Sequence, residues 1–181
     1  MKIHIVIVLI ILILFFIIYT FIYAYNKFQD FIIKINEVES KIDECLRNKF
    51  DIIIKLNSII KEKIKTNKAL VDDINELKDV QISSFEMDRK LNEAMSKVNF
   101  VKEKYEVFEG DEDTIRLIYE IEDIDESLLA FKKYYNECIT EYNVLIKKIP
   151  YLFIGKYFKY SEKKYFDGKD MNDENIDDFK I

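Results

Sequence analysis

The chain of 181 residues carries 28 Lys and Arg against 34 Asp and Glu, with only three Gly and one Pro. So few turn-forming residues argue against a turn-rich β fold, and the three glycines stand too far apart to form a phosphate-binding loop. The one histidine, His4, lies at the N-terminal tip, which excludes Ser-His-Asp, Cys-His and multi-histidine zinc sites. The composition therefore predicts an all-α protein that is not an enzyme and uses no cofactor.

Charge and hydropathy divide the chain into an apolar N-terminal segment (1–25), a middle segment (26–166) and an acidic tail (167–181). The middle segment is long enough for one domain with its own core, and its near-balanced charge argues against nucleic-acid binding. The tail lacks helical periodicity and is predicted to be disordered. Its Ile176 and Phe179 could act as a docking motif, and the alternative is that the tail only keeps the chain soluble.

The apolar segment from Ile5 to Tyr25 contains no charged residue. As a helix it would measure ~31 Å, close to the ~30 Å of a bilayer's hydrocarbon core. Bulky rings at Tyr23 and Tyr25 argue against a cleaved signal peptide, which needs small residues at its cleavage site. The segment is therefore predicted to anchor the chain in a lipid bilayer as a single-pass helix. The predicted anchor residues are Ile5, Leu9, Leu12, Phe16, Tyr19 and Tyr23.

The lysines beside the anchor predict its orientation. Those after the segment outnumber the one before it: Lys27, Lys34 and Lys41 against Lys2. The positive-inside rule then places the helical domain in the cytoplasm and the short N-terminus outside the cell membrane. Two distant cysteines, Cys45 and Cys138, fit a cytosolic domain without disulfides. A single disulfide in an oxidising compartment remains the alternative.

Three stretches of the middle segment place apolar residues at alternating steps of three and four, which predicts three amphipathic helices. The first stripe is Ile35, Val38, Ile42, Cys45, Ile52, Leu56 and Ile59. The second is Met87, Leu91, Ala94, Val98, Val101, Tyr105 and Phe108. The third is Ile121, Ile124, Leu128, Phe131, Tyr135, Cys138, Tyr142, Leu145 and Ile149. Lys49 fills a gap in the first stripe, and we expect its stem to pack while its ammonium group reaches water.

The helix ends have their own signals. Ser83-Ser84-Phe85-Glu86 predicts a capping box before the second helix. Gly110 can take the left-handed conformation after it, and the acids 111–113 favour the start of the third helix. Pro150 ends the third helix. Between Thr66 and Ser83 no Gly or Pro occurs, so the first helix can either continue or bend there.

These elements predict an antiparallel up-and-down helical bundle of three long helices plus a shorter C-terminal one. A three-stranded coiled coil formed by several copies of the chain is the alternative, so an oligomer remains one of the possibilities. Gly110 and the acidic residues after it favour a helical hairpin within one chain.

Motifs in the first and third helices resemble those of the LemA family of bacterial single-pass membrane proteins. The matching positions are Ile42, Asp43, Leu46, Asp51, Tyr135, Asn136, Tyr142, Asn143 and Pro150. The chain departs from the family pattern where Ile54 replaces a proline and where Phe131-Lys132 replaces Ala-Arg. The resemblance extends over about residues 1–167 and includes Tyr25-Asn26 and Gly155-Lys156-Tyr157-Phe158. It implies an N-terminal anchor, a cytoplasmic bundle and no established catalytic activity, and some relatives are associated with membrane organisation.

Polar residues near the third stripe have structural explanations. Tyr135, Cys138 and Tyr142 are expected to fill the core, because no nearby base would activate the thiol. Asn136 and Asn143 are expected to fix helix register by hydrogen bonding, with a solvated position as the alternative.

A group of acids lies beside the first positions of the third stripe: Glu120, Glu122, Asp123, Asp125 and Glu126. They fall mostly between apolar positions, so we expect a solvated face rather than an oxygen-ligand metal site.

The segment Lys147–Phe166 combines six lysines with seven aromatic residues. Alone it resembles a segment that lies on anionic lipid. If the three helices alternate in direction, however, a third helix of ~36 residues would carry Pro150 ~54 Å away from the anchor's membrane. Phe153, Tyr157 and Phe158 are then predicted to pack as a short helix on the far end of the bundle.

The sequence favours a non-enzymatic membrane scaffold or adaptor that binds an unidentified protein partner. The alternative is a sensor or regulatory subunit that couples the membrane to a partner enzyme. Crosslinked partners would separate the two functions.

Overall fold

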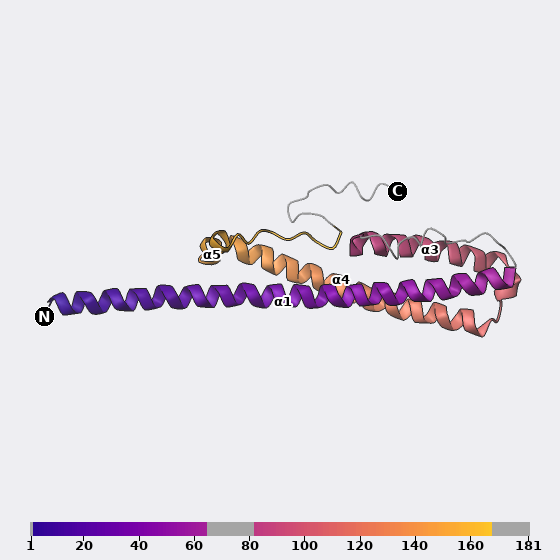
Figure 1. The fold of residues 1–181 in the computed structure, drawn as a ribbon, viewed down its shortest axis with the longest axis horizontal. Coiled ribbons are helices and arrows are strands. Elements are labelled where there is room, and N and C mark those ends of the chain that lie inside the picture. The colour runs from indigo at the N-terminus through magenta and orange to yellow at the C-terminus, as the bar shows by residue number, and fades with distance from the viewer. Residues whose placement is uncertain (1, 65–81, 168–181) are drawn as a thin grey trace. The chain divides into compact units, whose positions relative to one another are not determined.

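The computed structural model describes residues 2–64 and 82–167. These ranges contain four α-helices and a 3-10 turn, and no strand occurs in them, which confirms the all-α prediction. In chain order the elements are α1 (Lys2–Ile64), α3 (Ser84–Lys104), η2 (Glu106–Phe108), α4 (Glu112–Lys147) and α5 (Tyr151–Phe158) (Figure 1). The predicted boundary after Thr66 and all of the acidic tail except Asp167 fall outside the described residues.

α1 is a single helix of 63 residues. Its sequence holds neither Gly nor Pro, so no residue in it interrupts the backbone hydrogen bonding of a helix. Its N-terminal part is exposed, and the helix is long and apolar enough to cross a membrane. A buried stripe begins at Ala24, so the apolar stretch and the first packed residues belong to the same helix.

The described residues form two compact units. Unit 1 contains residues 2–37 and 135–165, and unit 2 contains residues 38–64, 82–134 and 166–167. α1 and α4 each contribute residues to both units. Unit 1 therefore joins the apolar stretch of α1 with the end of α4, with α5 and with the segment that follows α5.

In unit 2, α1 and α3 run in the same direction. Ser84 Oγ donates a hydrogen bond to Asp43 over 2.6 Å, and Lys49 Nζ donates one to Asn92 over 2.6 Å. Residue numbers therefore rise together along the two helices. A second helix that returns antiparallel to the first was expected, and on this point the structure differs from the up-and-down order.

α4 runs antiparallel to α1 in unit 2, whereas three helices of alternating direction would have made it parallel to the first. Lys49 pairs with Asp125, and Lys63 Nζ lies 2.5 Å from Asp111 Oδ1 near the start of α4. As residue numbers rise along α1 they therefore fall along α4. Three long helices of one chain pack together in this way, so the bundle is confirmed.

The predicted helix signals act at the ends of α3 and α4. The backbone N–H of Glu86 donates to Ser83 Oγ over 3.2 Å, which is the N-cap bond of the capping box. Gly110 has a φ of +72°, the left-handed conformation that glycine adopts without steric cost. The N–H of Thr114 donates to Asp111 Oδ2 over 3.2 Å, which caps the first turn of α4.

Most stripe positions are buried, but the prediction is wrong for two residues, which are exposed. α3 ends at Lys104, so Tyr105 leaves the helical register and is exposed. α4 ends at Lys147, so Ile149 is exposed as well. Both residues lie beyond a helix end, whereas Phe108, which also follows α3, is buried within η2.

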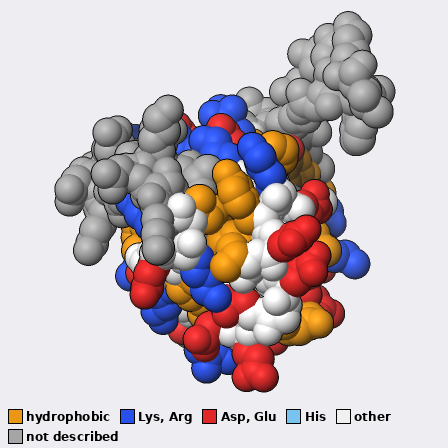
Figure 2. Space-filling model, turned by 90° about the vertical axis from the view of Figure 1, so that its right-hand side faces the viewer, with side chains coloured by type: hydrophobic (Ala, Val, Ile, Leu, Met, Phe, Trp, Pro, Cys, Tyr) orange, Lys and Arg blue, Asp and Glu red, His pale blue; other side chains and the backbone are white. Residues whose placement is uncertain are grey.

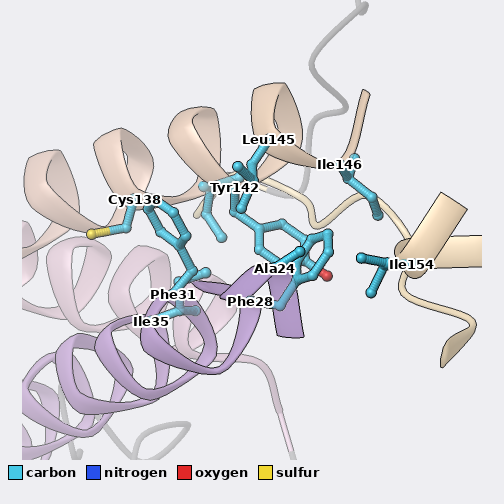
Figure 3. Packing of buried hydrophobic residues seen from close by; sticks show 10 residues of the cluster. Ala24, Phe28, Phe31, Ile35, Cys138, Tyr142, Leu145, Ile146 and Ile154 are labelled. Atoms are coloured by element: carbon cyan, nitrogen blue, oxygen red, sulfur yellow. The ribbon is translucent and has the colours of Figure 1, made fainter. Parts of the chain in front are cut away.

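The core of unit 1 lies between α1, α4 and α5 (Figure 3). Its buried residues are Ala24, Phe28, Phe31 and Ile35 of α1, Cys138, Ile139, Tyr142, Leu145 and Ile146 of α4, and Ile154 of α5. Gly155 permits the close approach of α5, because a Cβ at that position would lie 3.1 Å from Ile146 Cγ1. This contact holds the short helix against the end of α4.

Charged side chains of both signs are interspersed on the end of the molecule where α1 ends and α4 begins (Figure 2). Apolar side chains form smaller areas between them. Such a mixed surface suits contact with water, in agreement with the near-balanced charge of the middle segment.

Candidate functional site: an aromatic and basic surface beside the apolar stretch

The predicted anchor residues are all exposed along one continuous stretch of α1. Their exposed positions are Ile5, Leu9, Leu12, Phe16, Tyr19 and Tyr23. In water such a row of apolar side chains would be unfavourable, by about 25 cal/mol for each Å² of apolar surface. A stretch of this length and composition suits an apolar environment such as the core of a bilayer.

α5 packs directly against the C-terminal part of this apolar stretch. The ring centroids of Phe21 and Tyr157 lie 6.0 Å apart, and those of Phe21 and Phe158 lie 5.7 Å apart. Phe158 also contacts Tyr25, with 5.1 Å between the ring centroids. The short fourth helix was predicted correctly, but its predicted place at the far end of the bundle is wrong. α4 runs antiparallel to α1 and brings Pro150 back beside the apolar stretch.

Two of the three aromatic residues that were expected to be buried in α5 are instead exposed. Phe153 is 64% exposed and Tyr157 is 73% exposed, whereas Phe158 is half-buried. Ile149, just before α5, is 74% exposed. The packed side of α5 is formed by Ile154 and Gly155, so the opposite side presents apolar groups outward.

Lysines flank these exposed rings in the sequence. Lys147 pairs with Glu162, the one acid of the segment, over 3.1 Å. Four further lysines are exposed: Lys148, Lys156, Lys159 and Lys164. The surface of α5 and its flanks is therefore both aromatic and strongly positive.

An apolar groove separates α5 from the apolar stretch of α1. It has a volume of about 240 Å³ and is lined by Phe16, Ile17, Thr20, Phe21, Pro150, Phe153 and Ile154. The hydroxyl of Thr20, its one polar side chain, donates to the Phe16 carbonyl oxygen over 2.8 Å. The groove therefore offers hydrocarbon contacts and no hydrogen-bonding group that a polar ligand would need.

Asn143 is fully buried. The prediction that it fixes the register between two helices is wrong. Its Nδ2 donates to the carbonyl oxygen of Lys163, and the N–H of Lys163 donates to its Oδ1, each over 2.8 Å. One side chain thus replaces both backbone partners that Lys163 would have in a strand. Asn136 is half-buried, and its carbonyl oxygen accepts a bond from Thr140.

The segment that follows α5, residues 159–165, is held along α4 by such bonds. Lys159 has a φ of 58°, and its left-handed conformation ends α5 and turns the chain back. Tyr160 accepts a hydrogen bond from Gln29 over 2.8 Å, and Tyr165 lies 3.1 Å from the Thr140 hydroxyl. The Tyr142 ring packs edge-on against Phe28 beside them.

In unit 2, Lys49 contradicts its predicted behaviour. Its side chain is 0% exposed, so its ammonium group does not reach water. Nζ donates to Asn92 over 2.6 Å and to Asp125, one of the acids predicted to be solvated. A fully buried ammonium group is costly unless it is paired, and here an amide and a carboxylate pair it.

The other residues of the first family motif divide between core and surface. Ile42 and Leu46 are buried, and Asp43 accepts the hydrogen bond from Ser84. Asp51 is exposed and lies beside a polar groove of about 390 Å³ in unit 2. That groove is lined by Asn48, Asp51, Ile52, Lys55, Glu120, Asp123 and Ile124. Within the described ranges, no group of three or more His, Cys, Asp and Glu is placed to hold a metal ion.

Local burial and hydrogen bonding explain the pKa shifts of three titratable groups. Burial, and secondarily the charge of Glu44, raises the pKa of the Cys45 thiol, which keeps it protonated and weakly nucleophilic at neutral pH. Burial likewise raises the pKa of Tyr142. Hydrogen bonds from Lys63 and then Thr114 lower the pKa of Asp111. Each shift has a structural cause that requires no substrate.

These features define an all-α protein whose first helix joins an exposed apolar stretch to a packed bundle. The chain belongs to the LemA family, since the LemA family model matches residues 38–177. The match confirms the resemblance seen in the motifs, but it begins after the apolar stretch and therefore excludes Tyr25-Asn26. A search of curated proteins gives no match.

Sequence reasoning missed the link between α5 and the apolar stretch. The signal was present in the +5 charge and seven rings of Lys147–Phe166, which alone indicated a lipid-binding segment. This indication was set aside because the second helix was assumed to run antiparallel to the first. The buried pair of Lys49 and Asp125 was also missed, because the 76 residues that separate them hide the contact from any local pattern.

Proposed function

We propose that this LemA family protein is a non-enzymatic single-pass membrane protein whose helical bundle acts as a scaffold or adaptor beside the bilayer. α1 serves as the anchor, and the bundle lies in the cytoplasm with the short N-terminus outside. A protein partner binds the bundle, and the proposed role is in membrane organisation, with which some relatives are associated.

One observation carries this proposal: the exposed apolar stretch continues without a linker into the buried core of unit 1. Tyr23 is 54% exposed, whereas Ala24 and Phe28 are fully buried on the same helix. An anchor built in this way holds the packed residues of unit 1 at a fixed distance from the bilayer. Such a fixed distance suits a scaffold, since a flexible tether would merely retain a domain near the membrane.

The use of the buried polar groups supports a structural role. Lys49 bonds Asp125 and Asn92, and Asn143 bonds the backbone of Lys163. These bonds join elements of the fold to one another. A catalytic group would instead point into a cavity that a substrate can enter.

The lysines support the cytoplasmic orientation. Besides Lys27 and Lys34, the structure brings Lys148, Lys156 and Lys159 to the same end of the apolar stretch, through α5. Positive residues at one end of a span favour the cytoplasmic side for that end.

Membrane extraction tests the anchor, and labelling tests its orientation. The full chain should remain in the membrane after alkaline carbonate washing, and a variant that lacks residues 2–23 should be released. A single added cysteine at Asp178, in a background where Cys45 and Cys138 are serine, should react with a membrane-impermeant maleimide only after lysis. Labelling in intact cells would contradict the cytoplasmic bundle.

Crosslinking in isolated membranes tests the scaffold. A scaffold should yield membrane-shaping or structural neighbours in several copies. One stoichiometric enzyme or transporter would instead favour the regulatory subunit.

A further inference from the structure

We propose that α5 and its flanking lysines form a second membrane-binding surface, which contacts acidic phospholipids of the same bilayer that holds α1. This α5 surface comprises Ile149, Phe153, Tyr157, Lys148, Lys156 and Lys159. The inference rests on the proposed anchoring by α1 and adds a lipid class and a second contact to it.

The depth of α5 along α1 supports this contact. Pro150 and residues of α5 line a groove together with Phe16, Ile17, Thr20 and Phe21, which lie inside the apolar stretch. Phe21, whose ring contacts Tyr157 and Phe158, precedes Tyr25, the end of that stretch, by ~6 Å along a helix. If the stretch spans a bilayer, α5 therefore lies at the boundary between headgroups and acyl chains. Interfacial helices lie at this depth, ~5–10 Å into the boundary.

The pattern of α5 agrees with that position. Phe153, Lys156 and Tyr157 share one face, because residues three and four apart are neighbours on a helix. All three are exposed, on the side opposite to the buried Ile154 and Gly155. Aromatic rings prefer the interface, and a lysine beside them can extend its ammonium group to the headgroups.

The charge of the surface selects acidic lipids. Glu162, the one acid between Lys147 and Phe166, is paired with Lys147, and the remaining exposed lysines are not balanced within the segment. Each lysine close to an anionic membrane strengthens binding roughly fivefold. A partner protein with an acidic surface would also suit the lysines. It would not suit the exposed rings that continue the lipid-facing surface of the apolar stretch.

The groove between α5 and α1 also suits a phospholipid. It is apolar, and Phe16 and Phe21, which line it, are themselves exposed on the apolar stretch. An acyl chain can lie in it while its headgroup remains near the lysines. We therefore expect acyl-chain lipid to fill the groove when α1 is in a bilayer.

Tryptophan fluorescence tests the depth, since the chain contains no Trp. Phe153→Trp is compared with two exposed controls, Phe16→Trp in the apolar stretch and Tyr119→Trp in unit 2. Each full-length variant is placed in nanodiscs of phosphatidylcholine and phosphatidylglycerol, with and without brominated acyl chains. Bromine should strongly quench the fluorescence of Phe153→Trp and Phe16→Trp and leave that of Tyr119→Trp unchanged. Acrylamide, a quencher dissolved in water, should quench Tyr119→Trp most.

Two results would overturn the inference. Quenching of Phe153→Trp by acrylamide to the same extent as Tyr119→Trp would place α5 in water. Protection of Phe153→Trp from both bromine and acrylamide would mean that protein rather than lipid covers α5. If Phe16→Trp also escapes bromine, the anchoring itself fails; if only Phe153→Trp escapes, the anchor stands and the α5 surface does not.

A charge-matched pair of variants tests the lipid class. In the Phe153→Trp background, Lys148, Lys156 and Lys159 are changed to Gln, and the control changes three lysines of unit 2, Lys55, Lys104 and Lys133. Phosphatidylglycerol should increase bromine quenching in the control but not in the α5 variant. An equal response of both variants would show that net charge, and not this surface, attracts the acidic lipid.

Discussion

Unit 1 packs aromatic rings where unit 2 packs aliphatic side chains, although both units use stretches of α1 and α4. Phe28, Phe31 and Tyr142 lie in the core of unit 1, whereas Phe108 is the single aromatic among the buried hydrophobic residues described in unit 2. The polar contacts differ in the same way. Unit 2 joins its helices by charged pairs, and unit 1 holds a backbone segment through one buried amide.

This difference indicates that the two units solve different packing problems. Three helices of unit 2 need residues that fix their relative direction, and a buried ammonium group that bonds one residue on each of the two other helices does so. Unit 1 must also hold a short helix and the extended residues 159–165, which cannot bury a stripe of their own. Rings and a bidentate amide give such segments contact area and backbone bonds. The predictions below test this division, from the largest effect to the smallest.

Asp125→Ala should cause the largest loss of stability. It leaves the fully buried ammonium group of Lys49 with only the amide of Asn92, and loss of one partner of a buried pair costs about 3–5 kcal/mol. Lys49→Met should cost less, because Asp125 is 44% exposed and can be hydrated once its partner is gone. Urea unfolding of the full chain in detergent, followed by circular dichroism, measures both.

The double variant Lys49→Met with Asp125→Ala provides the control. An apolar replacement of both partners should recover much of the loss, and hydrogen exchange in unit 1 should remain unchanged. If Lys49→Met instead destabilises the fold as much as Asp125→Ala, the destabilisation by Asp125→Ala does not come from an unpaired ammonium group.

Asn143→Ala should release residues 159–165 from α4. It removes both bonds to Lys163, and the loss of buried hydrogen bonds of this kind costs about 1–3 kcal/mol. Hydrogen exchange should accelerate at Lys163 and its neighbours while α3 keeps its protection.

Asn143→Asp is the matched control. It keeps the acceptor for the Lys163 N–H but loses the donor to the carbonyl oxygen, so protection of that N–H should be retained in part. Equal exchange in both variants would show that the amide does not hold the segment.

Gly155→Ala should weaken the packing of α5. The added Cβ would lie 3.1 Å from Ile146 Cγ1, so the side chain must shift or α5 must move, and overpacking of this kind costs about 1–3 kcal/mol. Gly110→Ala is the control in unit 2, since nothing lies within 4 Å of its added Cβ and only the backbone conformation is strained. When each change is made in the Phe153→Trp background, bromine quenching should fall with Gly155→Ala and stay constant with Gly110→Ala.

The sequence predicted those parts of the fold that depend on neighbouring residues. The apolar stretch, the stripes, the Ser83 cap and the conformation of Gly110 all arise within a few residues, and the structure agrees with them. The direction of α3 could not be read in this way. It depends on Asp43 meeting Ser84, two side chains whose residue types fit many other partners.

The candidate site shows the same limit. Composition alone identified the rings and lysines of Lys147–Phe166 as suited to lipid, and the structure places Phe158 against Phe21 and Tyr25. The distance from the apolar stretch was derived from the assumed order of helices and was wrong. Asn143 was expected to bond another helix, but its partner is Lys163 in an extended segment without any periodic signal.

Asp111 should give the smallest effect, and it depends on pH. Hydrogen bonds from Lys63 and Thr114 hold the pKa of Asp111 below its ordinary value. A lowered carboxyl pKa stabilises the fold above the pKa of the unfolded chain, and this contribution is lost as pH falls through the folded pKa. Asp111→Asn keeps an acceptor but removes the charge. Between neutral pH and about pH 3, wild type should therefore lose slightly more stability than Asp111→Asn. Parallel losses in both chains would show that the contact of Lys63 with Asp111 contributes nothing to the stability of unit 2.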